Sequence, residues 1–428
     1  METLHVPRSS GSTRRWEIDA LRGLMLVLMT FTHLPTRLSS PMGQPFGYVS
    51  AAEGFVLLSA YVTGMVYSRL AQKQGIAAMR KAFLRRAAKV YFCQAASLLV
   101  LFTVIAAVGM KVDHAPVREI ISFYLREPIT ALLSGLALVY EPPLLDILPM
   151  YVVFMLVSPL VLGFALRSGW GRVIGASLLL WVLAQFDFGR WLHGQMVVFT
   201  GLPVSYVQTG PFVTFAWQFL WVLGLWMGSH TSDKAAGTWL FPGWAVVVAA
   251  VYAAACLVWR HWFGQIPFAP GFWANDAFDK WHLAPFRLIN LFALMVLAMH
   301  FADWLRRHAP RSRILETMGS ASLTVFCTHL LMVFLVLAWW GDSAQARPVW
   351  GDIALLAAVF AGLYGVAAIV AWLENSPARW VPAHERHPDS GDTAPELPPP
   401  LEGALLTERL QLAPGVAQPT RQRRWLRS

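Results

Sequence analysis

Two ionisable residues, Arg22 and His33, lie eleven positions apart in the first hydrophobic segment of the chain. At about 100° per residue, eleven residues return a helix to within roughly 20° of its starting face, so both side chains project from one side, roughly 16 Å apart along the axis. A charge and an imidazole are expensive inside an apolar segment, so the pattern predicts a polar site in the interior of a helical bundle. Asp19 extends this stripe. The alternative is an arginine that snorkels to the membrane surface and a histidine that ends the helix.

A carboxylate follows in the second apolar segment. His33 lies about four residues before the expected outer end of the first helix, and Glu53 about four residues after the outer start of the second. Antiparallel helices joined by a short loop bring such positions to one depth, so we expect His33 and Glu53 to meet beneath the outer surface. A carboxylate that orients an imidazole makes histidine a general base. Separate solvation of the two groups at the rim is the alternative.

A third ionisable side chain, His329, falls in the middle of a later apolar segment, where a polar ring needs a partner. It is a candidate for lining a channel through the bundle or for donating a hydrogen bond to a substrate oxygen. A structural hydrogen bond to a neighbouring helix is the alternative.

Membrane helices must position these residues. The 428-residue chain is 56% hydrophobic and only 14% charged, a balance typical of a polytopic membrane protein. The sequence therefore predicts an all-α bundle of about ten transmembrane helices, and the charged stretch 118–139 is expected to lie on or dip into the interface. The apolar segments fall at roughly 19–37, 50–69, 86–108, 146–166, 172–189, 212–229, 240–260, 286–305, 318–340 and 351–373.

The distribution of Lys and Arg sets the expected orientation. With the N-terminus inside, the inner segments hold 17 of these residues and the outer loops 9, so both termini are expected in the cytoplasm. The first segment has no cleavage site after it and is expected to remain as an anchor. Three regions follow: a cytoplasmic arm at 1–16, a membrane domain at 17–375, and a disordered cytoplasmic tail at 376–428.

Several classes of protein are disfavoured. The net charge of +10 follows from the topology, and no nucleic-acid-binding motif accompanies it. No Walker motif, dinucleotide loop or serine-hydrolase elbow occurs. The three cysteines fall inside apolar segments without metal-ligand spacing, so neither a disulfide nor a metal site is predicted. A transporter or flippase, which would usually show two related halves, and a non-catalytic partner in polysaccharide export both stay open.

Several short stretches together resemble a known family. The Arg22-x10-His33 spacing is similar to the signature of the membrane-bound acyltransferase-3 superfamily, which acylates sugars from acyl-CoA. The chain resembles still more closely the OpgC family, the succinyltransferases of osmoregulated periplasmic glucans. The matching stretches, within about residues 15–375, are Ile18–Leu24, Ala51–Ser59, Ile147–Tyr151, Phe215–Phe219, Lys280–Arg287 and Met318–His329.

The resemblance implies a donor site at the cytoplasmic face of a bacterial inner membrane. The phosphates of acyl-CoA, by resemblance succinyl-CoA, would bind Arg22, Arg85, Arg86 and Lys89, with Asp19 beside them. One departure stands out: the superfamily's Arg-x-x-Arg pattern reads Arg86-Ala-Ala-Lys89 here, or Arg85 with Lys89 one turn on. This keeps the positive charge but puts a guanidinium-specific role in doubt.

The resemblance also implies how the acyl group reaches the acceptor. The pantetheine arm, roughly 16–20 Å long when extended, would thread up the bundle toward His33. There His33 would deprotonate a hydroxyl of a periplasmic glucan or related polysaccharide, with Glu53 orienting the ring. No permanently bound cofactor is implied; the partners are acyl-CoA, the glucan, the lipid bilayer and the glucan synthase machinery.

Aromatic residues in the outer loops are candidates for stacking on the sugar. The predicted loops Phe188–Phe212 and Trp259–Pro285 hold several of them, and an interfacial aromatic belt is the alternative. They are Trp191, Tyr206, Trp262, Trp273 and Trp281.

Overall fold

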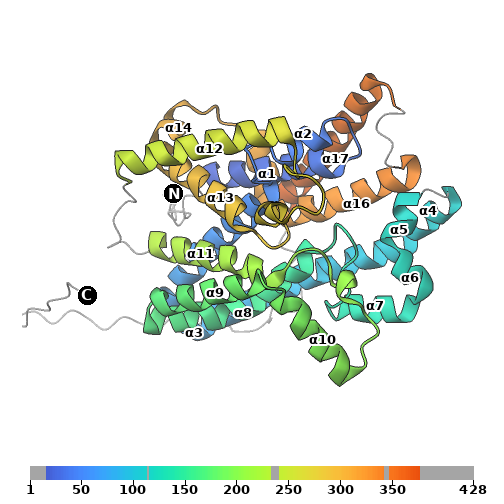
Figure 1. The fold of residues 1–428 in the computed structure, drawn as a ribbon, viewed down its shortest axis with the longest axis horizontal. Coiled ribbons are helices and arrows are strands. Elements are labelled where there is room, and N and C mark those ends of the chain that lie inside the picture. Colours follow the sequence, from blue (N-terminus) through green and yellow to red (C-terminus); the bar gives the residue numbers. More distant parts are fainter. Residues whose placement is uncertain (1–15, 113–114, 233–240, 342–346, 376–428) are drawn as a thin grey trace, which may run out of the picture. The chain divides into compact units, whose positions relative to one another are not determined.

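The computed structural model describes residues 16–112, 115–232, 241–341 and 347–375. Every regular element in these residues is a helix (Figure 1), as the composition predicts. The predicted tail 376–428, and the predicted arm apart from Trp16, lie outside the described residues.

The helices follow the predicted apolar segments closely. The first half of the chain forms α1 Trp16–His33, α2 Ser39–Gly43, α3 Ala51–Val100, a π-helical turn Leu101–Ile105, α4 Ala106–Val112, α5 Ala115–Ile120, α6 Ser122–Arg126, α7 Pro128–Leu136, α8 Ile147–Ser168, α9 Trp170–Ala184 and α10 Phe188–Thr200. The second half forms η2 Tyr206–Thr209, α11 Thr214–Ser232, α12 Gly243–Phe263, η3 Trp273–Phe278, α13 Pro285–His300, α14 Ala302–His308, α15 Arg313–Ser320, α16 Ser322–Trp340 and α17 Val349–Asn375.

The long element α3 is a hairpin of two helical arms. Gly75, at φ 86° and ψ 169°, has a backbone conformation that only glycine adopts readily, and it breaks the helix. Tyr67 and Phe83 stack with ring centroids 4.0 Å apart, whereas sixteen residues of straight helix would separate them by about 24 Å. The basic run 69–89, which falls between the apolar segments predicted at 50–69 and 86–108, is therefore helical on both sides of one sharp bend.

Among the described residues, six helical segments are long and apolar enough to cross a membrane, or eight if two bent pairs each form one span. The bent pairs are α9 with α10, at 79°, and α13 with α14, at 62°. A count of ten would also require α1, which carries four ionisable residues, and both arms of α3 to cross, so ten stays a prediction. The six segments are Ala51–Val112, Ile147–Ser168, Tyr206–Ser232, Gly243–Phe263, Ser322–Trp340 and Val349–Glu374.

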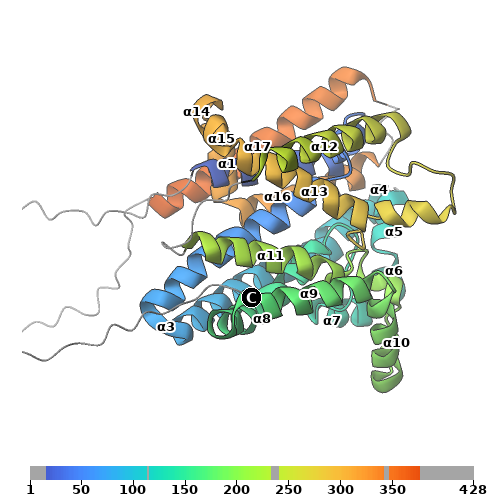
Figure 2. The same ribbon diagram turned by 60° about the vertical axis from the view of Figure 1, so that its left-hand side comes forward.

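The structure adds detail to two predicted regions. The stretch 118–139 is divided among three short helices, α5 to α7, none of them long enough to span a bilayer, and its expected place at the interface stays a prediction. The predicted outer loop Phe188–Phe212 contains the helix α10, which projects away from the neighbouring helices (Figures 1 and 2). The pattern of apolar residues did not reveal the break between α9 and α10. It occurs where Asp187 adopts a left-handed backbone conformation at φ 58°.

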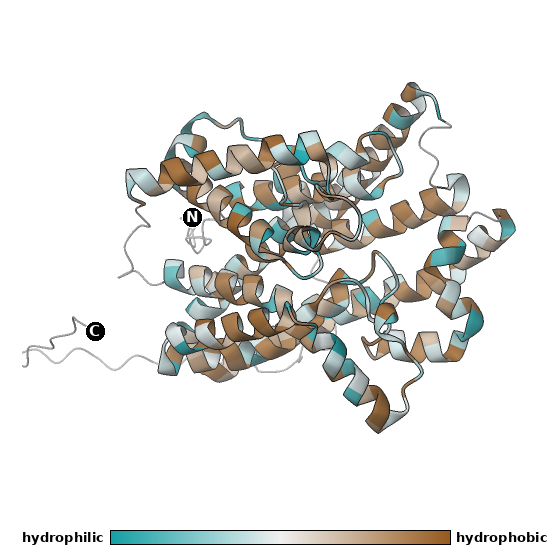
Figure 3. Ribbon diagram, viewed as in Figure 1, coloured by the Kyte–Doolittle hydropathy of each residue, from teal (hydrophilic) through white to brown (hydrophobic). Residues whose placement is uncertain are grey.

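The bundle separates interior helices from outer ones. The segment Tyr206–Ser232 contains α11, which packs against α3 and α9, and 67% of its most apolar stretch is buried inside the protein. In α12 and α17 the buried share of the corresponding stretch is only 22%. Apolar residues make up much of the outer helices, and polar residues gather at the ends and loops (Figure 3). The poorly buried apolar faces of α12 and α17 are suited to lipid.

The helix α1 is held in the interior by a close crossing with α15. A Cβ atom on Gly319 would overlap the carbonyl oxygen of Asp19, and one on Gly23 would overlap that of Leu315. Only glycine permits this backbone approach. The start of α1 and the end of α17 lie on the same side of the bundle, which is also the side of the bend in α3 (Figure 2).

Candidate functional site

The helix α1 ends at His33, and that end meets the middle of α16. The Nδ1 atom of His33 lies 3.0 Å from Nε2 of His329, and the two rings stack with centroids 5.2 Å apart. His329 is completely buried, whereas His33 is partly accessible. The sequence singled out both residues without predicting that they touch each other.

The hydrogen bonds of His329 define the protonation pattern of the pair. Its Nδ1 atom lies 2.9 Å from the carbonyl oxygen of Phe326, and a carbonyl can only accept, so Nδ1 carries the hydrogen. The neutral ring then has a bare Nε2, which accepts a hydrogen bond from Nδ1 of His33. The remaining nitrogen of His33, Nε2, is left with its lone pair, as a general base requires.

The structure does not pair Glu53 with His33 as the sequence led us to expect. One carboxylate oxygen accepts a hydrogen bond from Arg287 on α13, and the other accepts from the backbone and hydroxyl groups of Ser50 in a capping box. Both side chains of the Glu53–Arg287 ion pair are 1% exposed. The carboxylate oxygens are thus engaged by stronger partners, and His329 takes the position beside His33 that was expected for Glu53.

A cavity of about 250 Å³ opens beside His33. It is enclosed by the end of α1, the start of α3, the segment that leads into α8, the segment before α11, the loop before α13, and α16. Six separate parts of the chain therefore meet around the imidazole. The lining residues are Met29, Thr32, His33, Ser50, Ala51, Ala52, Pro143, Leu144, Asp146, Ile147, Pro211, Phe212, Lys280, Trp281 and Phe326.

Lys280 brings a cation into this cavity. Its Nζ atom lies 4.7 Å from the ring centroid of Trp281 and 5.6 Å from that of Phe212, a cation–π arrangement. No carboxylate of the described residues forms a salt bridge with it. Burial lowers the pKa of Lys280, and the carboxylates of Glu53 and Asp146 oppose this shift.

The carboxyl group of Asp146, also in the cavity wall, only partly balances the positive charge of Lys280. Burial raises the pKa of Asp146 to about 7, with Lys280 acting in the opposite direction. Near neutral pH the carboxyl group is therefore about half protonated. With Glu53 already paired to Arg287, the cavity has a surplus of positive charge.

The loop that carries Lys280 is fixed by hydrogen bonds from buried side chains. The indole nitrogen of Trp217, on α11, donates to the Trp281 carbonyl oxygen at 3.1 Å, and that of Trp181, on α9, donates to the Leu283 carbonyl oxygen at 3.1 Å. Gln185 donates to the carbonyl oxygen of His282 at 2.8 Å. The Trp281 carbonyl oxygen also accepts from the backbone N–H of Val213 at 3.2 Å. Together these bonds hold Lys280 on one side of the cavity.

The residues expected at the donor face lie along α1 and the second arm of α3. Arg22 donates a hydrogen bond to the hydroxyl of Ser322 at 2.5 Å, and Asp19 is buried at the crossing with α15. Arg85 and Lys89 are exposed and Arg86 is half-buried. A role of these five residues in phosphate binding remains a prediction.

The aromatic candidates divide into two groups. Trp281 lines the cavity beside His33, and Tyr206 lines a second cavity at the base of α10. Trp191, Trp262 and Trp273 are 59%, 80% and 75% exposed, which agrees with the alternative of an interfacial belt.

Three charged residues of the site were not singled out from the sequence. Lys280 and Arg287 entered only as the ends of a stretch that resembles the family and as outer-loop cations, without a role of their own, and Asp146 was read as the edge of an apolar segment. A usable signal existed for Arg287, since it stands two residues after Pro285 at the start of an apolar helix, where a charge needs a buried partner. No local pattern relates Asp146 to Lys280, because they are more than a hundred residues apart.

Comparison with known proteins places the chain in a family. No curated protein and no solved structure matches it. The family model described as "OpgC protein" matches residues 14–375, which include every residue of the cavity. The chain therefore belongs to the OpgC protein family, and this membership indicates a glucan-modifying acyltransferase built into a multi-pass membrane protein.

Proposed function

We propose that the protein transfers an acyl group from acyl-CoA to a hydroxyl group of a periplasmic glucan, with His33 as the general base. The observation that most strongly supports this proposal is the His33–His329 pair at the cavity, because its hydrogen bonds leave Nε2 of His33 with a free lone pair. The hydroxyl proton moves to Nε2 as the oxygen attacks the thioester carbonyl. The carbon–sulfur bond then breaks, and the CoA thiolate takes the proton back from His33.

The geometry of α1 supports delivery of the donor from the cytoplasmic side. His33 is the last residue of α1, and Arg22 lies on the same helix eleven residues earlier, about 16 Å away along the axis. A pantetheine arm of roughly 16–20 Å can span this separation. The side of the bundle where α1 begins is also the side of the bend in α3 (Figure 2). The sequence around that bend is rich in Lys and Arg, which suits the phosphates of CoA.

We further propose that the acyl group is a dicarboxylic one such as succinyl. Lys280 supports this, because an ammonium group without a salt bridge in the cavity wall suits a ligand with a negative charge. A free carboxylate on the acyl chain would balance the surplus charge left by the neutral Glu53–Arg287 pair. An acetyl group would leave the ammonium unpaired.

Replacement of Lys280 by Met should change the choice of donor. A hydrogen bond to a charged group contributes about 1.5–3 kcal/mol, so we expect kcat/KM for succinyl-CoA to fall roughly ten- to a hundredfold. The value for acetyl-CoA should stay within about twofold, since that donor has no carboxylate to pair. Lys111→Met, at an exposed lysine on α4, is the matched control. An equal loss for both donors would show that Lys280 acts on the reacting thioester and not on the acyl carboxylate.

Transfer of radiolabel from acyl-CoA to glucan by the purified protein tests the function itself. We expect labelled, ester-linked glucan that releases its label on mild alkaline treatment. A transporter would move label or glucan without forming the ester, and a non-catalytic partner would need an added enzyme. Either outcome would replace acyl transfer as the function.

A further inference from the structure

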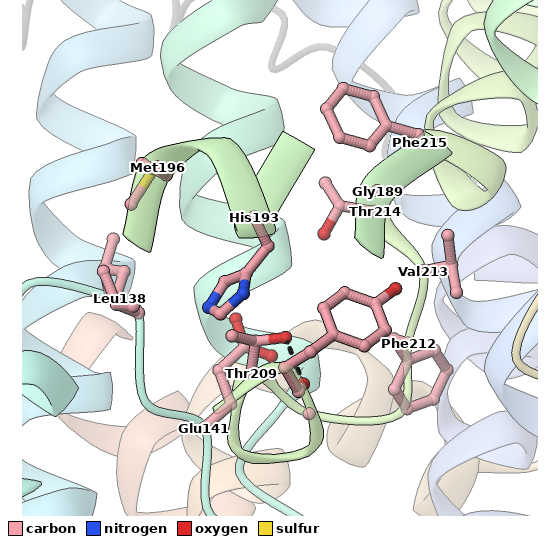
Figure 4. Close-up of a pocket in the computed structure, with 13 residues that line it drawn as sticks. Leu138, Glu141, Gly189, His193, Met196, Thr209, Phe212, Val213, Thr214 and Phe215 are labelled. Carbon is pink, nitrogen blue, oxygen red and sulfur yellow. Dashed lines mark hydrogen bonds between the residues drawn. The ribbon is translucent and has the colours of Figure 1, made fainter. Parts of the chain in front are cut away.

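A second cavity, of about 220 Å³, lies at the base of α10. Figure 4 shows His193 from α10 pointing toward the segments that carry Glu141 and Thr209, with Phe212 and Phe215 on the other side. Its volume is below the roughly 300–1,000 Å³ typical of pockets for drug-sized ligands. The space suits one small ring.

The walls of this cavity combine aromatic faces with polar groups that lack protein partners. Nε2 of His193 is buried and has no hydrogen-bond partner among the described residues, although a buried polar atom normally has one. The ring of Tyr206 packs against His193, with centroids 5.7 Å apart. The guanidinium carbon of Arg190 lies over the ring of Tyr206, 5.9 Å from the ring centroid.

The charge state of the walls indicates an uncharged ligand. Burial, with Asp146 close by, raises the pKa of Glu141 well above its usual range, which favours the protonated carboxyl group. A protonated carboxyl group donates one hydrogen bond and accepts others, and so does a neutral imidazole. Such groups suit a ligand whose hydroxyl groups both donate and accept, as on a polyhydroxylated ring. They suit a phosphate or a cation less well.

The second cavity adjoins the cavity that holds His33. Phe212 lines both, and Gly210 packs between Glu141 of one wall and Asp146 of the other, where a Cβ atom would overlap the Glu141 carboxyl group. A glycine at φ 80° lets the chain turn in this narrow space. The two cavities therefore lie side by side across a thin shared wall, as neighbouring units of one linear ligand would require.

We propose that this cavity is a second acceptor subsite, which binds a glucosyl unit next to the one that is acylated. The proposal rests on the acyl transfer to glucan put forward above. Aromatic faces at Tyr206, Phe212 and Phe215 stack on the sugar ring, and Glu141 and His193 bond its hydroxyl groups. The subsite gives the enzyme a preference for oligomeric acceptors over free glucose.

The dependence of the kinetics on acceptor length tests the subsite. The acceptors are glucose and linear gluco-oligosaccharides of two to eight units, with wild type, Tyr206→Ala and Glu141→Leu, which keeps a similar volume but removes the hydrogen-bonding groups. We expect KM for the octasaccharide to rise about tenfold in each variant, with kcat and all glucose kinetics unchanged. Val207→Ala, at a neighbouring residue that is 84% exposed, is the control and should match wild type.

Direct binding separates this subsite from the chemistry. In a His33→Ala background, Tyr206→Ala should weaken octasaccharide binding by about the same tenfold. An unchanged octasaccharide KM, or an equal rise for glucose and octasaccharide, overturns the subsite. Absence of transfer to every acceptor by the wild-type protein would instead refute the proposed function, so the two failures are distinguishable.

Discussion

His33→Ala should insert into the membrane and bind acyl-CoA as the wild type does, yet transfer acyl groups about 10²–10⁴ times more slowly. The reason is that Nε2 of His33 is the base of the proposed reaction, and no other histidine lines that cavity. The measurement is kcat for labelled transfer to glucan, with donor affinity measured separately. His300→Ala, at an exposed histidine that ends α13, is the matched control and should retain full activity.

His329 supports the base through one hydrogen bond, so we expect His329→Ala to lower kcat less than His33→Ala does. His329→Ala removes the acceptor that holds Nδ1 of His33 and fixes its tautomer. Because the two rings act as a unit, the double variant should be scarcely slower than His33→Ala alone. Strictly additive losses would mean that the histidines act independently. A His33→Ala protein with near-normal kcat would remove His33 from the mechanism.

Arg287→Met should destabilise the folded protein by about 3–5 kcal/mol, because it leaves the carboxylate of Glu53 buried and unpaired. Both side chains are 1% exposed, so solvent cannot replace the lost partner. Glu53→Leu alone should cost a similar amount, since it strands the guanidinium instead. The measurement is the midpoint and slope of denaturant unfolding in detergent micelles.

The double variant Glu53→Leu/Arg287→Met is the informative control for this ion pair. Removal of both charges should recover most of the stability that either single change loses, because a buried pair is often neutral relative to apolar residues. A double variant as unstable as the sum of the singles would contradict a mainly structural pair. Catalysis by a folded double variant would also show that Glu53 does not orient His33.

The sequence was sufficient to predict the helices, because apolar segments about twenty residues long have few alternatives in a membrane. The α3 hairpin was partly predictable, since the basic run 69–89 indicated a turn between two spans. Its helical character up to Gly75 was not, because only the φ value of one glycine decides where the bend occurs. The break before α10 likewise depends on one left-handed residue, Asp187.

The site was predictable in its members more than in its contacts. His33, His329 and Glu53 each carry a polar group inside an apolar segment, which is visible from one sequence. Which of them pair depends on how distant helices pack: α16 presents His329 to His33, and α13 presents Arg287 to Glu53. Such contacts between residues more than two hundred positions apart leave no local pattern.

Acyl transfer from the outside to the inside of proteoliposomes tests the central claim most directly. Labelled acyl-CoA is added outside vesicles that hold purified protein and enclose unlabelled glucan, and the enclosed glucan is then recovered and counted. Wild-type protein should label the enclosed glucan while acyl-CoA stays outside, and His33→Ala should reduce this label by about two orders of magnitude or more. Equal labelling by His33→Ala and wild type, or none by wild type with intact donor and acceptor, would contradict acyl transfer across the membrane at His33.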